Sequence, residues 1–314
     1  MTDKAKIALI VGPTSVGKTA VGVECAIRLD AEIISADSIQ IYKTLDIGSA
    51  KPGAEDMRGI PHHLMDFYGI GDAKFSVAEF QRLANERITD IVSRKKLPLI
   101  VGGTGLYVNS LVFPLDFTST PANEAFRDEM NALEEARPGS LYWLLKDKDP
   151  DSAKRLNYND RKRIIRALEV LEFSGDGIGT DFSNNADNDI PYEPVMIGLT
   201  MPREKLYERI NRRVDIMMQS GLLDEVDALL KAGYDPKLPA MQGLGYKQLL
   251  AYRRGESTLD EAVELIKRET RRFAKRQLTW FKRDKRIHWL DMSEFKSAAE
   301  AANAACSIIA GEEQ

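Results

Sequence analysis

The chain has 314 residues, of which 44 are Lys or Arg and 48 are Asp or Glu, and its formal net charge is -4 at pH 7. With 43% hydrophobic residues, this composition is typical of a globular protein and argues against a disordered chain, a collagen or a membrane-spanning protein. The chain shows no export signal, and its two cysteines form no C-x-x-C pair, so we expect a cytoplasmic protein with reduced thiols.

Apolar runs alternate with helix-like segments along most of the chain. This alternation is typical of an α/β fold in which helices flank a mainly parallel sheet. Strands are predicted at 7–11, 32–35, 97–101, 195–199 and 287–290, and helices at 17–29 and 258–281.

The pattern changes between about 114 and 189. Segments 124–136 and 150–173 are charged and helix-patterned, and 175–189 is rich in Gly, Asn and Asp, which predicts an exposed, mobile loop. We interpret 114–189 as a helical insertion domain, and 1–113 together with 190–314 as the core.

Basic residues concentrate in three places despite the negative net charge. Ten Lys or Arg residues stand between 267 and 286 against two acidic ones, and further clusters lie at 154–166 and 203–213. Each run alone is more often a solvated helix face than a binding site. Three such runs in an acidic chain favour a polyanionic partner.

A phosphate-binding loop is predicted at 12–19, which fits G-x-x-x-x-G-K-[ST] between a predicted strand and a predicted helix. In such a loop the backbone N–H groups and the helix N-terminus face the phosphates, Lys18 adds a charge, and the Thr19 hydroxyl ligates Mg²⁺. We therefore expect a P-loop NTPase-like core that binds a di- or triphosphate. The loop residues are Gly12, Pro13, Thr14, Ser15, Val16, Gly17, Lys18 and Thr19.

Asp37 follows the second predicted strand, at the sheet edge where open α/β sheets bind ligands. Its carboxylate can hold Mg²⁺, act as a base, or only cap a turn, and these roles stay open on this residue alone. The small-residue turns at 48–52 and 101–107 either allow a ligand to approach the backbone or are only tight turns. His62 and His63 lack a third ligand at metal spacing, so we predict packing or hydrogen bonding for them.

Ten motifs follow one another along the chain: GPTSVGKT (12–19), ADSIQIY (36–42), GSAKP (48–52), PHHLMD (61–66), FSVAEF (75–80), VGGTGLY (101–107), NDRKRIIRALEV (159–170), RINRRVDIMMQSGLLDEV (209–226), GLGYKQLLAY (243–252) and RRFAKRQLTWFKR (271–283). With these motifs in this order, the sequence resembles the tRNA dimethylallyltransferase family, also called tRNA isopentenyltransferases. Only the first motif is shared widely with other nucleotide-binding families. Ser15 and Val16 stand where the family usually has Ala and Ser.

The resemblance implies an enzyme that transfers a dimethylallyl group from dimethylallyl diphosphate to N6 of the adenosine next to the third anticodon base of tRNA, releasing pyrophosphate. It implies that Asp37 accepts the N6 proton, and that Thr14 and Lys18 hold the diphosphate. By the same resemblance, Arg213 stabilises the leaving group, and Mg²⁺ is the cofactor with Thr19 as its ligand.

The resemblance also implies contacts with tRNA, whose target adenine must be flipped out of the anticodon loop. The insertion corresponds to the family's domain that grips the anticodon stem-loop, and we expect a monomer. The implied tRNA-contacting residues are Asp37, Ser38, Ile39, Gln40, Thr104, Arg127, Lys162, Arg163, Ile164, Ile165, Arg166, Gln242, Gly243, Leu244, Gly245, Tyr246 and Lys247.

Three other functions fit parts of the sequence. A prenyltransferase of free adenine nucleotides shares the core but needs neither the insertion nor the basic helix at 258–281. A small-molecule kinase shares the phosphate loop, and Arg161, Arg163 and Arg166 resemble the phosphate clamps of a kinase lid. An RNA-binding module without catalysis leaves the phosphate loop and Asp37 unexplained.

Overall fold

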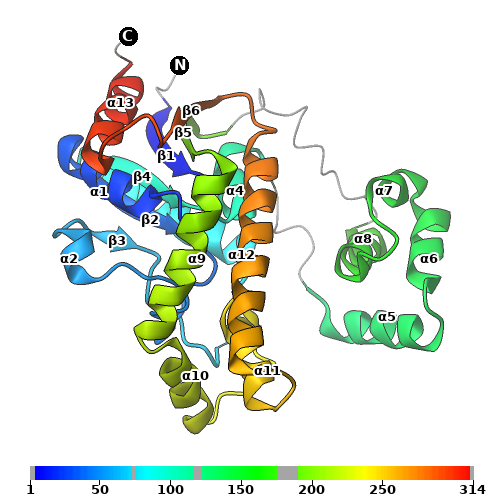
Figure 1. Ribbon diagram of the computed structural model, residues 1–314. Helices are drawn as coiled ribbons and strands as arrows, with labels where there is room; N and C mark the ends of the chain where they lie inside the picture. Colours follow the sequence, from blue (N-terminus) through cyan, green and yellow to red (C-terminus); the bar gives the residue numbers. More distant parts are fainter. Residues whose placement is uncertain (1–3, 73–74, 116–121, 175–189, 312–314) are drawn as a thin grey trace. The chain divides into compact units, whose positions relative to one another are not determined.

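The computed structural model describes residues 4–72, 75–115, 122–174 and 190–311. The chain divides into two compact units, of which the larger comprises Met1–Pro114 and Asn188–Gln314 and the smaller Leu115–Asp187. In Figure 1 the larger unit contains the sheet, and the described part of the smaller unit consists of helices and their connections. The loop predicted at 175–189 lies outside the described residues.

A six-stranded sheet with the order β3-β2-β4-β1-β5-β6 forms the centre of the larger unit, and every pairing in it is parallel. The predicted α/β architecture is confirmed, with all five predicted strands. The short edge strand β3 was not predicted because two residues show no periodicity. The strands are β1 (Ala5–Val11), β2 (Ala31–Ala36), β3 (His62–His63), β4 (Leu97–Gly102), β5 (Tyr192–Thr200) and β6 (Ile287–Asp291).

Helices cover the sheet because its central strands are buried on both faces, which also explains their continuous apolar sequences. Alternate residues of β1, Ala8 and Ile10, pack in one core cluster with residues of α1 and α13, while α3 contacts β2 and β4. No helix in the described ranges is both long and apolar enough to cross a membrane. The helices of the larger unit are α1 (Lys18–Arg28), α2 (Ala54–Met57), α3 (Val77–Ser93), α4 (Gly105–Val112), α9 (Arg203–Gln219), α10 (Leu222–Lys231), α11 (Tyr246–Arg253), α12 (Leu259–Phe281) and α13 (Ala298–Ala310), with a 3₁₀ turn at Pro239–Gln242.

Helix α12 confirms the helix predicted at 258–281. It begins with a capping box, in which Thr258 accepts from the Glu261 N–H and Glu261 accepts from the Thr258 N–H. Its apolar stripe is buried, as Ile266 and Phe281 show, whereas most of its cations stay accessible. In Figure 1, α12 and α9 run side by side, and these two helices carry two of the three basic clusters.

The smaller unit is built from α5 (Glu124–Ala136), α6 (Ser140–Lys148), α7 (Pro150–Arg155) and α8 (Arg161–Ser174). The segment predicted to be helical at 150–173 is two helices. The break occurs because Leu156 is extended and the Asn157 side chain accepts the Asn159 N–H, which closes a turn that competes with the helix.

Glu169 is a fully buried carboxylate in the core of the smaller unit. It accepts two hydrogen bonds from Arg127, each 2.9 Å long, one of 2.6 Å from Arg166, and one from the Asn123 N–H. Burial acts to raise the pKa of Glu169, but these hydrogen bonds outweigh it and hold the pKa below its usual range. The carboxylate therefore stays charged and ties α5 to α8.

We expect Arg127→Met to destabilise the smaller unit by roughly 1–3 kcal/mol, because the buried Glu169 loses two of its hydrogen-bond donors. Hydrogen exchange of peptides from 122–174 measures this as faster exchange. Lys148→Met is the matched control, since it removes an exposed ion pair with Glu172 and should change stability by about 0.5 kcal/mol or less. Equal protection in wild type and Arg127→Met would contradict the expectation.

Candidate functional site

A pocket of about 640 Å³ opens at the carboxyl ends of β1, β2 and β4. Val11 and Ala36 both pair with Gly102, so the loops that follow these three strands emerge together. The volume is in the usual range for small-molecule sites. The residues that line it include Thr14, Ser15, Gly17, Lys18, Thr19, Asp37, Gln40, Ser49, Ala50, Lys51, Arg209 and Arg213.

The phosphate-binding loop connects β1 to α1, as its motif predicts. A side chain at Gly12 would place its Cβ 2.5 Å from the Leu199 carbonyl oxygen, so only glycine lets β1 leave the sheet here. At the other end, Gly17 adopts a left-handed conformation and caps α1. The loop thereby presents Lys18 and Thr19, the first two residues of the helix, to the pocket.

Lys18 is the titratable group of the pocket whose pKa departs most from its usual range. Burial lowers the pKa of Lys18 to about 7, with the charge of Arg213 adding to this effect and that of Asp37 opposing it. The ammonium donates a 2.7 Å hydrogen bond to the Pro13 carbonyl. Burial also lowers the pKa of Arg213 below its usual range. An anion that enters the pocket would therefore stabilise both cations.

Asp37 lies at the end of β2, beside these two cations. Its Oδ1 atom accepts from the N–H of Ile39 at 2.9 Å and from that of Gln40 at 3.3 Å, so the residue caps a turn. In the described part of the chain, no hydrogen bond reaches its Oδ2 atom. One carboxylate oxygen thus fixes the orientation of this pocket-lining residue, so the capping role and a catalytic role are compatible.

Thr104 lies at the turn that follows β4, next to the segment that contains Asp37, and is not among the residues that line the pocket. Its N–H donates to the Ala36 carbonyl at 3.1 Å, and its Oγ1 accepts the Ser38 N–H at 3.0 Å. These contacts hold the turn after β4 against the segment that contains Asp37.

Sequence reasoning missed two residues of this region. Arg209 lines the pocket one helical turn before Arg213 on α9, and the i, i+4 spacing of the two arginines was a usable signal. Gln277, buried on α12, accepts the Thr14 N–H at 2.8 Å and donates to the Gly103 carbonyl at 2.9 Å. It thus joins the phosphate-binding loop to the turn of Thr104, a link that spacing along the chain does not reveal.

Two of the segments implied to contact tRNA lie together in the larger unit. A Cβ at Gly243 would be 3.5 Å from the Cδ1 atom of Ile39, so 38–40 adjoins 242–247. Gln242 and Lys247 are exposed, whereas Tyr246 is fully buried. The side chain of Tyr246 therefore packs in the interior of the protein. The predicted RNA contact is corrected, because this side chain anchors the segment instead.

The implied tRNA residues of the smaller unit divide in the same way. Lys162 and Arg163 are exposed on α8. Ile164 and Ile165 are 1% and 5% exposed, and their side chains pack in the core, so they are corrected from RNA contacts to packing residues. Arg127 and Arg166 bind Glu169, and any contact they make with RNA comes in addition to that structural role.

His62 and His63 form hydrogen bonds, one of the two roles predicted for them. His62 Nδ1 is 2.8 Å from the Ile60 carbonyl, and His63 Nε2 is 2.8 Å from the Glu32 carboxylate. The described residues contain no cluster of three or more His, Cys, Asp or Glu side chains suited to a metal ion. A single hydroxyl such as that of Thr19 nevertheless fits a Mg²⁺ ion that takes its remaining ligands from a bound diphosphate and water.

Comparison with known proteins gives one consistent result. The family model described as IPP transferase matches residues 40–284. The tRNA dimethylallyltransferase of Alkaliphilus oremlandii is 48% identical over 302 residues, which are 95% of each chain. The solved tRNA isopentenylpyrophosphate transferase of Bacillus halodurans is 42% identical with a TM-score of 0.73 and 98% of both chains covered. A eukaryotic dimethylallyltransferase solved acting on tRNA is 27% identical, with a TM-score of 0.81, 98% of this chain and 80% of that one covered.

The low pKa of Lys18 predicts proton uptake on anion binding. A bound pyrophosphate raises that pKa, so above pH 7 binding takes up a proton, and affinity falls as pH rises, by at most about tenfold per pH unit. Calorimetric titration with pyrophosphate at pH 8, in two buffers of different ionisation enthalpy, measures the uptake. Lys18→Arg is the control because arginine does not titrate there. Equal uptake by both proteins would refute the assignment to Lys18.

Proposed function

The chain belongs to the IPP transferase family, and we propose that it transfers a dimethylallyl group from dimethylallyl diphosphate to N6 of the adenosine 3′-adjacent to the anticodon of tRNA. The observation that carries the proposal is the pocket in which the Asp37 carboxylate lies beside Lys18 and Arg213. This arrangement combines a proton acceptor with a site for a departing anion.

Asp37 is the proposed base. The N6 amino group attacks the C1 carbon of the dimethylallyl group, the bond from that carbon to the diphosphate oxygen breaks, and the amino group loses one proton. The exocyclic amine of adenine is a weak nucleophile, so a carboxylate that takes the proton as the C–N bond forms lowers the barrier. Oδ2 of Asp37 is suited to this role because the turn of Ile39 and Gln40 holds the other oxygen.

The cations of the pocket stabilise the leaving pyrophosphate. Negative charge grows on its oxygens as the C–O bond breaks. Lys18 and Arg213 attract that charge more strongly because they are buried, where water screens the attraction less. The loop amides and Arg209 add donors at the same end of the pocket. A Mg²⁺ ion bound at Thr19 would neutralise further diphosphate charge.

The basic helices supply the proposed tRNA contacts. The exposed cations of α9 and α12, and Lys162 and Arg163 on α8 of the smaller unit, suit the phosphates of an anticodon stem-loop. The target base must leave its stack to reach Asp37, and the neighbouring segments 38–40 and 242–247 are placed to receive it. We propose that one copy of the chain performs the reaction.

Incubation of the pure protein with Mg²⁺, labelled dimethylallyl diphosphate and either unmodified tRNA or AMP tests the function. Mass analysis of the nucleosides and a pyrophosphate assay provide the readout. We expect label on an adenosine of tRNA, with an equal amount of pyrophosphate. Label on AMP alone would indicate a free-nucleotide prenyltransferase, and phosphoryl transfer from ATP without prenylation would indicate a kinase.

Asp37→Asn should lower the single-turnover rate of prenylation by roughly 10²-fold or more and change tRNA affinity by less than about threefold. The amide keeps the oxygen that caps the turn but accepts no proton. Asp56→Asn is the control, since this carboxylate lines the same pocket yet accepts the Gly53 N–H at the start of α2. Lost tRNA binding with an unchanged rate would make Asp37 a recognition residue instead.

A further inference from the structure

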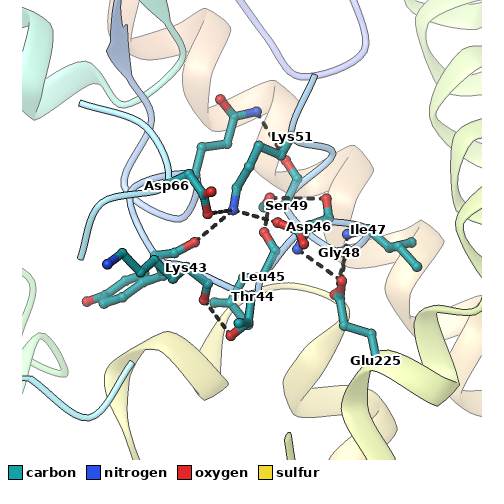
Figure 2. Close-up of polar contacts among 12 residues, drawn as sticks. Lys43, Thr44, Leu45, Asp46, Ile47, Gly48, Ser49, Lys51, Asp66 and Glu225 are labelled. Atoms are coloured by element: carbon teal, nitrogen blue, oxygen red, sulfur yellow. Dashed lines mark hydrogen bonds and ion pairs between the residues drawn. The ribbon is translucent and has the colours of Figure 1, made fainter. Parts of the chain in front are cut away.

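Glu225 of α10 places its carboxylate against the turn at 46–50, which follows the motif at 36–42, as Figure 2 shows. Its oxygens accept three consecutive backbone N–H groups, those of Asp46 at 2.9 Å, Ile47 at 2.8 Å and Gly48 at 3.1 Å. Successive amides that converge in this way form an anion-binding concavity. Here the anion is a side chain from a helix that lies nearly 180 residues further along the chain.

Tyr246 completes this arrangement from α11. Its hydroxyl donates a 2.6 Å hydrogen bond to the Oε1 atom of Glu225, and burial, followed by that bond, raises the pKa of Tyr246 well above its usual range. A Cβ at Gly48 would lie 2.5 Å from the Tyr246 ring. The ring therefore packs directly on the backbone of Gly48, which explains the glycine of the GSAKP motif.

The turn held by Glu225 forms part of the pocket wall. Hydrogen bonds from the Ala50 N–H to the Ile47 carbonyl and from the Lys51 N–H to the Asp46 carbonyl close it. The Lys51 ammonium reaches Asp46 and Asp66 at 2.6 Å each, and the Tyr42 carbonyl at 2.9 Å, and Figure 2 shows it pointing between the two carboxylates. These three acceptors match the three protons of the ammonium group, so Lys51 ties the turn to Asp66 and to the backbone of Tyr42.

Backbone carbonyls of the 46–50 turn accept hydrogen bonds from Gln40. The Gln40 side-chain amide donates to the Ser49 and Ala50 carbonyls, each at 3.2 Å, and the Gln40 N–H donates to Asp37. A continuous chain of hydrogen bonds thus runs from Glu225 through the turn at 46–50 to Gln40 and the proposed base.

We propose that Glu225, supported by Tyr246, is a positioning residue that sets the 46–50 turn and through it the adenosine subsite formed by Gln40 and Asp37. This inference rests on the proposed function. It gives Tyr246 a role in aligning the reacting base, which its complete burial permits, in place of a direct contact with tRNA.

Glu225→Gln tests the proposal because the amide keeps the shape but turns an NH₂ group toward the Gly48 N–H or the Ile47 and Asp46 N–H groups. We expect the single-turnover rate of tRNA prenylation, at saturating enzyme and dimethylallyl diphosphate, to fall at least tenfold, with pyrophosphate affinity within threefold of wild type. A rate constant measured with enzyme in excess does not depend on the folded fraction, so a purely structural defect would leave it unchanged. Tyr246→Phe should have a smaller effect, since the Glu225 carboxylate keeps its three backbone N–H donors.

Asp227→Asn is the matched control. Asp227 is on the same helix and forms an ion pair with Arg253 of α11, but it does not reach the turn at 46–50. Its rate should stay within threefold of wild type. A wild-type rate for Glu225→Gln, or an equal loss in Asp227→Asn, would overturn the proposal.

Three further outcomes are distinguishable. If Glu225→Gln does not fold, Gly48→Ala tests the same turn through the Tyr246 ring, with a tenfold loss supporting the proposal and a wild-type rate overturning it. If the wild-type protein prenylates no tRNA, the proposed function fails and the positioning role fails with it. Wild-type transfer that is unaffected by these variants overturns the positioning role alone.

Discussion

Two cations held beside one carboxylate, with water partly excluded, impose the main constraint on this structure. Burial lowers the pKa of both Lys18 and Arg213, because a charged group is less stable in the protein interior than in water. Asp37 compensates only part of that charge. An incoming anion would therefore stabilise the arrangement, and binding of the proposed diphosphate would offset the free-energy cost of keeping the cations desolvated.

Such a site works only if the loops that carry the charged groups keep their positions. The sheet gives a first level of order, because β1, β2 and β4 end next to one another. Polar side chains from helices distant in the sequence fix the loops further. Gln277 joins the phosphate-binding loop to the turn of Thr104, and Glu225 holds the turn at 46–48. Both use side-chain oxygens to satisfy backbone N–H groups that secondary structure leaves unpaired.

These anchors also connect recognition with chemistry. The buried Gln277 lies on α12, whose opposite face carries exposed cations. In the segment 242–247, the buried Tyr246 likewise lies close in sequence to the exposed Gln242. The elements proposed to contact tRNA therefore hold the loops of the pocket through their buried faces. The smaller unit follows a similar principle on its own scale, since Arg127 and Arg166 satisfy the buried Glu169 while Lys162 and Arg163 remain at the surface.

The sequence by itself determined the α/β fold, the phosphate-binding loop and the strand end that carries Asp37. These features follow from local spacing, because a buried strand, a glycine turn and a helix start are each specified by neighbouring residues. The partners Gln277 and Glu225 were decided by tertiary structure alone, since each meets a backbone about 180 to 260 residues away. Burial was decided there as well. The buried Ile164 and Ile165 follow the exposed Arg163, and the buried Tyr246 precedes the exposed Lys247, so only packing shows which side chains face inward.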